Sequence, residues 1–126
     1  MKEIIAIIRM NKVNATKKAL ADAGVCGLHA MKVMGRGKMQ VDFSVLDQLG
    51  VREEIGGILA EGLSGGSRLI PKRMLTILIQ DGDVKRVVDT IIKVNQEGNK
   101  GDGKIFVTPV LDAFRVRTGD RGEAAI

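Results

Sequence analysis

A strand–helix–strand pattern that occurs twice along the chain constrains the fold more than any other feature. In the first half, the β-branched run Ile4–Arg9 predicts a buried strand. We expect Asn11 to cap a helix with apolar residues at three- and four-residue spacings, and Gly24 to end it in a left-handed conformation. Residues 25–34 then alternate loosely and predict a second strand that ends at Gly35.

The second half repeats this order. Residues 73–80 predict a strand, and Asp81 is expected to cap a helix with an apolar stripe of Val84, Val87, Val88, Ile91 and Ile92. Strands are predicted over Ile105–Thr108 and around Phe114–Arg117. The order predicts an α+β fold, a ferredoxin-like split βαβ (βαββαβ) sandwich in one domain over residues 1–126. Its helices would cover one sheet face and leave the other bare and apolar, so we expect oligomers.

A long loop over residues 36–71 separates the two halves. It contains seven glycines, yet leucines and isoleucines recur among its acidic residues. A loop of this length in so small a domain is usually functional or disordered. Its apolar side chains indicate a surface for a protein partner.

Composition excludes several classes. The chain has 126 residues, 44% of them hydrophobic and 28% charged, and no apolar run long enough for a membrane span. We expect no signal peptide. The single cysteine, Cys26, fits a reducing cytoplasm and is expected to be a small buried side chain. The net charge of +5 is compatible with nucleic-acid binding. With three phenylalanines and no Tyr or Trp, however, the chain has few aromatic rings on which the bases of single-stranded nucleic acid could stack. Duplex binding through phosphates stays open.

The sequence Gly101-Asp102-Gly103-Lys104 is the main candidate for a binding site. Glycines let a turn aim backbone N–H groups at an anion, and Lys104 adds a positive charge. Arg115 and Arg117, two apart in a predicted strand, would leave the same face about 7 Å apart. Together these residues predict a polyphosphate cage. The alternatives without a ligand are a tight turn at Gly101–Lys104, with Asp102 as turn former, and a solvated strand face at Arg115.

No catalytic or metal site emerges from the sequence. His29 has no second His or Cys at ligand spacing, and no Ser-His-Asp or Cys-His set can be assembled from one histidine. The sequence therefore predicts a protein that is not an enzyme and holds no protein-bound metal.

The motifs together resemble the PII nitrogen-regulatory signal proteins. They comprise the N-terminal strand, Gly35-x-Gly37, the pair Pro71-Lys72, Val88–Ile92, Gly101–Val107, Arg115–Gly119 and the tail Glu123–Ile126. The long loop is then the family's T-loop. The loop base, the expanded loop and the re-entry over Ile70–Met74 look most like archaeal PII-like proteins encoded with nitrogenase genes, which act in pairs to inhibit nitrogenase.

The resemblance implies a cytoplasmic homotrimer, alone or mixed with a paralogous subunit. It would bind ATP or ADP between neighbours and sense 2-oxoglutarate together with Mg-ATP. By position, the nucleotide would meet Gly35, Arg36, Gly37 and Lys38 at the loop base, the turn Gly101, Asp102, Gly103 and Lys104, and the clamps Arg115 and Arg117. Lys72 would meet a 2-oxoglutarate carboxylate. A protein target would bind the loop: nitrogenase, or alternatively an ammonium transporter or glutamine synthetase, in signal transduction or transcription regulation.

Two departures from the family pattern concern the effector. Met39 stands where the family usually has a glutamine whose carbonyl helps to hold magnesium, and a thioether is a poor ligand for a hard cation. Gln40 is next to it, so either the loop shifts by one residue or 2-oxoglutarate is sensed differently. The tyrosine that is modified in other members cannot exist here, because the chain has no Tyr.

Two other functions remain open at the level of sequence. One is a ferredoxin-like module of the ACT type that senses a small molecule, with the basic residues merely solvated. The other is a slow ATPase, which would need a held metal and a positioned water. Nucleotide binding separates the first alternative from the regulator.

Overall fold

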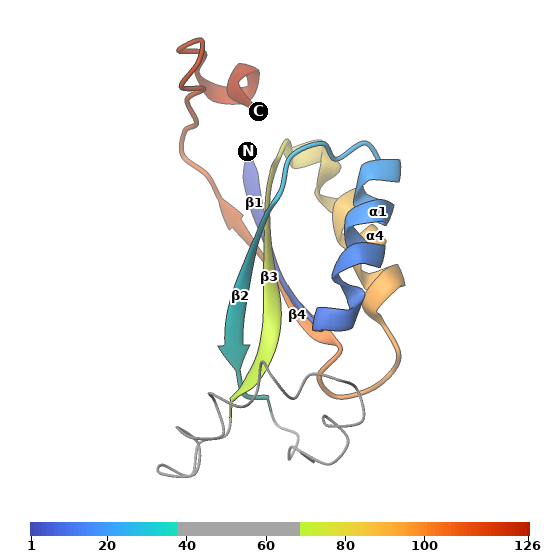
Figure 1. Ribbon diagram of the computed structural model, residues 1–126. Helices are drawn as coiled ribbons and strands as arrows, with labels where there is room; N and C mark the ends of the chain where they lie inside the picture. Colours follow the sequence, from blue (N-terminus) through green and yellow to red (C-terminus); the bar gives the residue numbers. More distant parts are fainter. Residues whose placement is uncertain (38–68) are drawn as a thin grey trace.

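The computed structural model describes residues 1–37 and 69–126 (Figure 1). Four strands form one antiparallel sheet in the order β2-β3-β1-β4. They are β1 (Lys2–Ile8), β2 (His29–Gly35), β3 (Ile70–Ile79) and β4 (Gly103–Pro109). Two helices, α1 (Val13–Asp22) and α4 (Val84–Asn95), cover one face of the sheet (Figure 1). This is the predicted ferredoxin-like α+β architecture. The long loop lies almost wholly outside the described residues.

The core lies between the helices and the covered face of the sheet. Alternate residues of the two central strands are buried there, because successive strand side chains point to opposite faces. The buried apolar set is Ile4, Ala6, Ile8, Leu20, Val25, Leu75, Ile77, Ile79, Val87 and Ile91. The register places Ile4 opposite Ile77 on one side and Val107 on the other, so β1 lies between β3 and β4.

The helices begin one or two residues later than the expected caps imply. Short 3-10 segments, η1 (Met10–Lys12) and η2 (Asp81–Asp83), precede α1 and α4. Neither Asn11 nor Asp81 is an N-cap, and no side chain caps either helix. The predicted end of α1 is confirmed: Gly24 has φ +85°, and the N–H groups of Gly24 and Val25 donate to the carbonyls of Ala21 and Leu20. This is the Schellman pattern, for which glycine is favoured.

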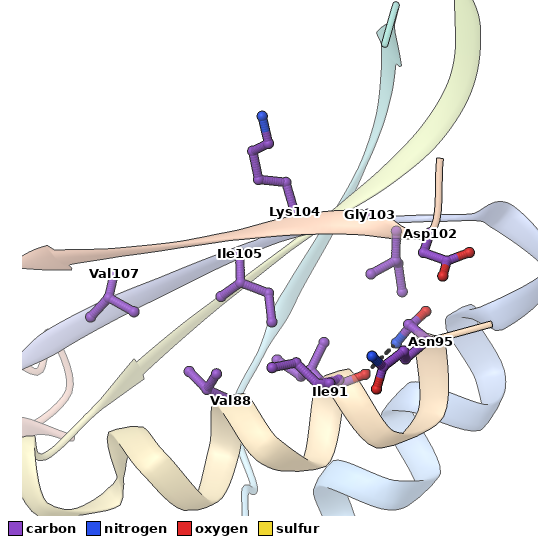
Figure 2. A pocket seen from close by; sticks show the side chains of 11 residues that line it. Val88, Ile91, Asn95, Asp102, Gly103, Lys104, Ile105 and Val107 are labelled. Carbon is purple, nitrogen blue, oxygen red and sulfur yellow. Dashed lines mark hydrogen bonds between the residues drawn. The ribbon is translucent and has the colours of Figure 1, made fainter. Parts of the chain in front are cut away.

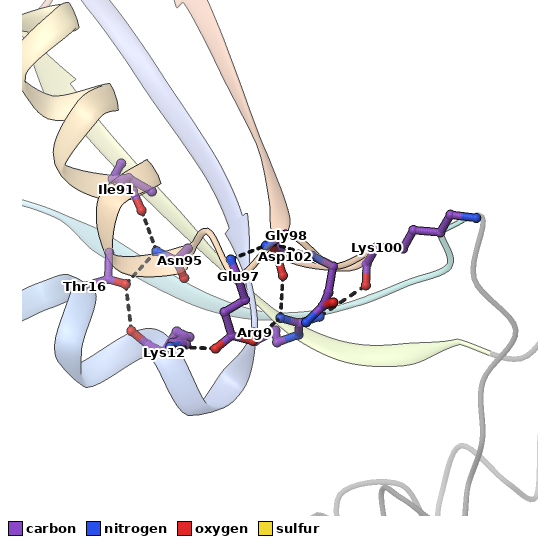
Figure 3. Close-up of polar contacts among 10 residues, drawn as sticks. Arg9, Lys12, Thr16, Ile91, Asn95, Glu97, Gly98, Lys100 and Asp102 are labelled. Atoms are coloured by element: carbon purple, nitrogen blue, oxygen red, sulfur yellow. Dashed lines mark hydrogen bonds and ion pairs between the residues drawn. The ribbon is translucent and has the colours of Figure 1, made fainter.

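A buried polar contact joins the two helices. Asn95 Nδ2 donates to Thr16 Oγ1 at 3.0 Å and to the Ile91 carbonyl at 2.9 Å (Figure 3). Thr16 in turn donates to the Lys12 carbonyl at 2.7 Å. Thr16 and Asn95 are the buried polar side chains of the described residues. Their pairing satisfies most of the hydrogen-bonding capacity that burial would otherwise leave unmet.

The face of the sheet opposite the helices is apolar and uncovered, as predicted. Ile5 lies between Thr76 and Phe106, and Ile7 lies between Met74 and Lys104. Met31 is 55% exposed and Phe106 46% exposed. In the described part of the chain nothing packs on this face.

The predicted strand at Phe114–Arg117 is wrong. The chain leaves the sheet at Pro109, and residues 116–118 form a turn. A single bridge pairs Phe114 with Arg121, and a 3-10 turn, η3 (Gly122–Ala125), follows. The prediction that Cys26 is buried is also wrong, because it lies exposed after Gly24.

Candidate functional site

Most of the predicted binding residues meet at one end of the sheet. β2 ends there at Gly35, which pairs with Ile70 at the start of β3. At the same end Gly103 pairs with Ile8, the last residue of β1. Lys72 Nζ donates to the Gly101 carbonyl at 2.8 Å, so β3 touches the turn directly. Arg36 and Gly37 follow β2 at this end and are exposed.

The glycines of the turn are required by the backbone. Gly101 has φ +94° and Gly103 has φ +134°, a region that side chains with a Cβ rarely adopt. A Cβ on Gly103 would lie 2.4 Å from the Ile7 carbonyl oxygen. A Cβ on Gly101 would lie 3.3 Å from Arg9 Nη2 and 3.7 Å from Lys72 Nζ. Two cationic side chains therefore crowd the outer edge of this turn.

The Asp102 carboxylate holds the turn together from inside. Its Oδ2 accepts the backbone N–H groups of residues 97, 98 and 99 at 2.7, 2.9 and 3.1 Å (Figure 3). Its Oδ1 accepts Arg9 Nη1 at 2.7 Å. These contacts, first among them the Glu97 N–H, hold the pKa of Asp102 below its ordinary value. The side chain is thus engaged as a turn former and is not directed at a ligand.

Lys104 is exposed, and within the described residues it has no hydrogen-bond or ion-pair partner. It points to the uncovered face of the sheet, away from Ile105, which points toward α4 (Figure 2). The ammonium group of Lys104 is therefore available to an anion at this end of the molecule.

Lys72 is half-buried beside the turn. Burial lowers the pKa of Lys72, the nearby Arg9 guanidinium lowers it further, and Asp102 opposes the change. A desolvated ammonium group next to a second cation gains more from an incoming carboxylate than a solvated lysine would.

The two predicted arginine clamps lie at the other end of the sheet. β4 carries the chain from Lys104 to Pro109, a rise of roughly 17 Å, before the C-terminal segment begins. That segment extends away from the turn between α4 and β4 (Figure 1). One chain therefore does not bring Lys104 and Arg117 to the same ligand.

The two arginines also differ from each other, because they do not share the strand face that was expected. Arg115 Nη1 contacts Asp120 Oδ2 at 2.9 Å and Nη2 donates to the Ala124 carbonyl at 2.9 Å. Arg115 thus closes the C-terminal turn. Arg117 is exposed and makes no such contact within the described residues.

A groove of about 490 Å³ lies between α4 and β4. Its walls are mainly apolar, and Asp102, Gly103 and Lys104 stand at one end of it (Figure 2). Asn95 also lines the groove, and its Oδ1 is buried without a hydrogen-bond partner.

Three predicted residues, Lys38, Met39 and Gln40, lie outside the described residues. Conversely, sequence reasoning missed Arg9, which contacts the turn from the end of β1. The signal was a basic residue that directly follows a buried strand, but only the sheet order shows which loop it faces.

Over residues 1–37 and 69–126, no helix is long and apolar enough to cross a membrane. In the same ranges, no three His, Cys, Asp or Glu side chains gather as a metal site.

Comparison with known proteins identifies the family. The sequence profile described as "Nitrogen regulatory protein P-II" matches residues 1–120. The chain is 44% identical to "Nitrogen fixation nifHD region GlnB-like protein 2" of Methanothermobacter marburgensis over the full length of both. It is 46% identical to the protein of that name in Methanococcus maripaludis, again over both full lengths. It is 40% identical to "Nitrogen regulatory protein P-II 2" of Methanothermobacter thermautotrophicus, over all of this chain and 97% of that protein.

These matches confirm the resemblance on which the sequence motifs converged. The family is one of nitrogen regulators and not an enzyme family. With its family match over residues 1–120, its ferredoxin-like fold and its glycine-framed turn, this chain belongs to the nitrogen regulatory protein P-II family.

Proposed function

We propose that this chain is a cytoplasmic P-II regulator of nitrogen fixation that binds ATP or ADP between the subunits of a trimer. The names of several relatives refer to the nifHD region, which supports nitrogenase as the target of the loop 36–71. An ammonium transporter or glutamine synthetase is the alternative target. A mixed trimer with a paralogous subunit is compatible with the same interfaces.

One observation carries the proposal of a shared site. Lys104 and Arg117 are exposed cations without partners among the described residues; Lys104 stands at the start of β4, and Arg117 belongs to the C-terminal segment that follows the other end of β4. An apolar, uncovered sheet face offers the surface through which subunits can associate. A neighbour could then supply Arg117 to the turn that contains Lys104. A nucleotide triphosphate, with about four negative charges, suits such a set of cations.

Calorimetry with ATP and ADP tests nucleotide binding. Lys104→Ala and Arg117→Ala should each weaken binding by about 1.5–3 kcal/mol, the range for a hydrogen bond to a charged group. Lys93→Ala removes an exposed lysine on α4 and should leave the affinity unchanged. Absence of ATP and ADP binding by the wild-type protein would refute the proposal and favour the ACT-type alternative.

Mixing the two variants tests whether the site is shared. If Lys104 and Arg117 come from different subunits, trimers that contain both variants regain intact sites. In a random 1:1 mixture about a quarter of all sites would be intact, because one pairing in each mixed ring combines the unmutated residues. If each chain provides a whole site, mixing restores none.

We further propose that 2-oxoglutarate is the effector and that Lys72 binds one of its carboxylates, with Mg-ATP beside it and Gln40 in place of the glutamine usual at position 39. Binding of purified nitrogenase, measured by interferometry with and without 2-oxoglutarate, tests the target and the effector together. Lys72→Gln should abolish the effect of 2-oxoglutarate and retain ATP binding. Equal binding with and without the effector would contradict this part of the proposal.

A further inference from the structure

Arg9 stands at the junction between β1 and η1 and reaches across to the segment that joins α4 to β4. Its Nη1 donates to Asp102 Oδ1 at 2.7 Å and to Glu97 Oε2 at 3.2 Å, and its Nη2 donates to the Lys100 carbonyl at 3.2 Å (Figure 3). One side chain thus contacts the segment 97–102 at three places. Its side chain is only 24% exposed.

The segment that Arg9 contacts is folded around the carboxylate of its own Asp102. Asp102 Oδ2 accepts three successive backbone N–H groups, which is the way such a loop would bind a free anion. With Arg9 on Oδ1, the carboxylate makes four hydrogen bonds. Arg9 therefore adds a charged partner to a carboxylate that the backbone N–H groups already hold in place.

A second ion pair attaches the same segment to the start of the first helix. Glu97 Oε1 contacts Lys12 Nζ at 2.8 Å, while Glu97 Oε2 contacts Arg9. Lys12 is the last residue of η1, which begins directly after Arg9. The end of β1 and η1 therefore act as a fixed support for the turn.

We propose that Arg9 is a positioning residue that sets the anion affinity of the turn Gly101–Lys104 without touching the anion. This inference rests on the proposed nucleotide function. Within residues 1–37 and 69–126, the hydrogen bonds of the Arg9 guanidinium all go to acceptors of the segment 97–102, from both of its terminal nitrogens. Its role is to hold Asp102, and through Asp102 the backbone on which Lys104 is mounted. An ordered turn binds more tightly because less conformational entropy is lost on binding.

The test compares Arg9→Met with Arg9→Lys in the full-length protein. The test has two readouts: the affinity for ATP and for tripolyphosphate, from calorimetry, and the rate of amide hydrogen exchange at residues 97–99. Arg9→Met should weaken ATP binding about 10-fold and speed exchange at these amides, because Asp102 loses its partner. Arg9→Lys keeps the positive charge but has one terminal nitrogen in place of the two of the guanidinium group. It should therefore have part of the affinity that Arg9→Met loses. Arg86→Met, which removes an exposed arginine paired with Asp83, is the matched control and should change neither.

A double-mutant cycle separates positioning from general destabilisation. Asp102→Asn should resemble Arg9→Met, and the double variant should bind no more weakly than Asp102→Asn, because both changes remove the same link. Additive losses would overturn the inference.

The remaining outcomes are distinct. Unchanged affinity with faster exchange would show that order in the turn does not set binding and would overturn the inference alone. Lost affinity with unchanged exchange would make Arg9 a ligand contact and also overturn it. A wild-type protein that binds neither ATP nor tripolyphosphate would overturn the proposed function itself.

Discussion

Gly103 shows how a single residue can be required by geometry before any ligand is considered. It pairs with Ile8 as β4 begins, and its φ of +134° turns the chain from the loop into the sheet. The Ile7 carbonyl oxygen occupies the space that a Cβ would need. Glycine at this position is thus a condition for the fold, independent of any ligand.

Gly103→Ala should lower the free energy of unfolding by about 2–3 kcal/mol, since the Cβ meets backbone and the φ is strained. Urea denaturation at fixed protein concentration measures the change. Gly27→Ala is the control, because a Cβ there meets nothing within 4 Å and no strained φ is involved. Equal stability of the two variants would contradict the predicted clash.

Asp102 gives the protein a defined acid response. Its hydrogen bonds hold the pKa of Asp102 below the ordinary value of 3.8, so the folded state binds its proton less readily than the unfolded state does. The stabilisation is present above that ordinary value and is lost as the pH falls through the lowered pKa. Between about pH 5 and pH 2, wild type should therefore lose more stability than Asp102→Asn.

Denaturation curves collected along this pH series provide the measurement. Asp22→Asn, which removes an exposed carboxylate paired with Lys18, is the control and should follow wild type closely. Parallel curves for wild type and Asp102→Asn would show that the Asp102 carboxylate contributes nothing specific.

At the scale of elements, the two helices are held together by more than apolar packing. α1 and α4 pack side by side on the sheet, and the Thr16–Asn95 hydrogen bond lies buried between them. Thr16 Oγ1 gives its hydrogen to the Lys12 carbonyl, so it can only accept from Asn95. This fixes the orientation of the Asn95 amide and leaves its Oδ1 without a partner.

Thr16→Val should destabilise the protein by about 1–2 kcal/mol, because it removes the acceptor from a buried amide. Combined with Asn95→Ala in a double-mutant cycle, it should give a coupling energy of about 1 kcal/mol. Thr90→Val is the matched control: Thr90 also donates to a carbonyl four residues earlier, at 2.8 Å, but this hydrogen bond is exposed to solvent. Zero coupling in the cycle would refute the contact between the helices.

At the scale of the whole molecule, one face of the sheet carries exposed apolar side chains that nothing in the described residues covers. Apolar side chains from all four strands share it, and it lies opposite both helices (Figure 1). Exposed apolar surfaces of this kind mark sites of association. Assembly through this face would also bring different chains close enough to share a ligand.

Phe106→Glu should convert the proposed oligomer to monomers, because it places on this face a charge that assembly would bury. Light scattering after gel filtration measures the mass. Ile92→Glu, a similar change on the helix-covered side where Ile92 is 42% exposed, should leave the mass unchanged. The reverse result would place the interface on α4.

Much of this architecture was predictable from local patterns. The β-branched runs and the two amphipathic stripes give the order of strands and helices, and Gly24 marks a helix end, because these signals depend on neighbours within a few residues. The helix starts were missed, since Asn11 and Asp81 lie within 3-10 turns that no cap signal distinguishes. The strand predicted at Phe114–Arg117 was wrong because a strand needs a partner edge, and β-rich composition alone does not provide one.

The sequence by itself determined the strand and helix order, the glycine-framed turn, the apolar second face and the family. Only the tertiary structure decided that Arg9 contacts the turn, that Asp102 faces inward, and that the segment with Arg117 follows the end of β4 opposite Lys104. The reason is physical. Periodicity and turn chemistry are local, whereas the contacts of Arg9 span about ninety residues and exist only because β1 lies between β3 and β4 in the sheet.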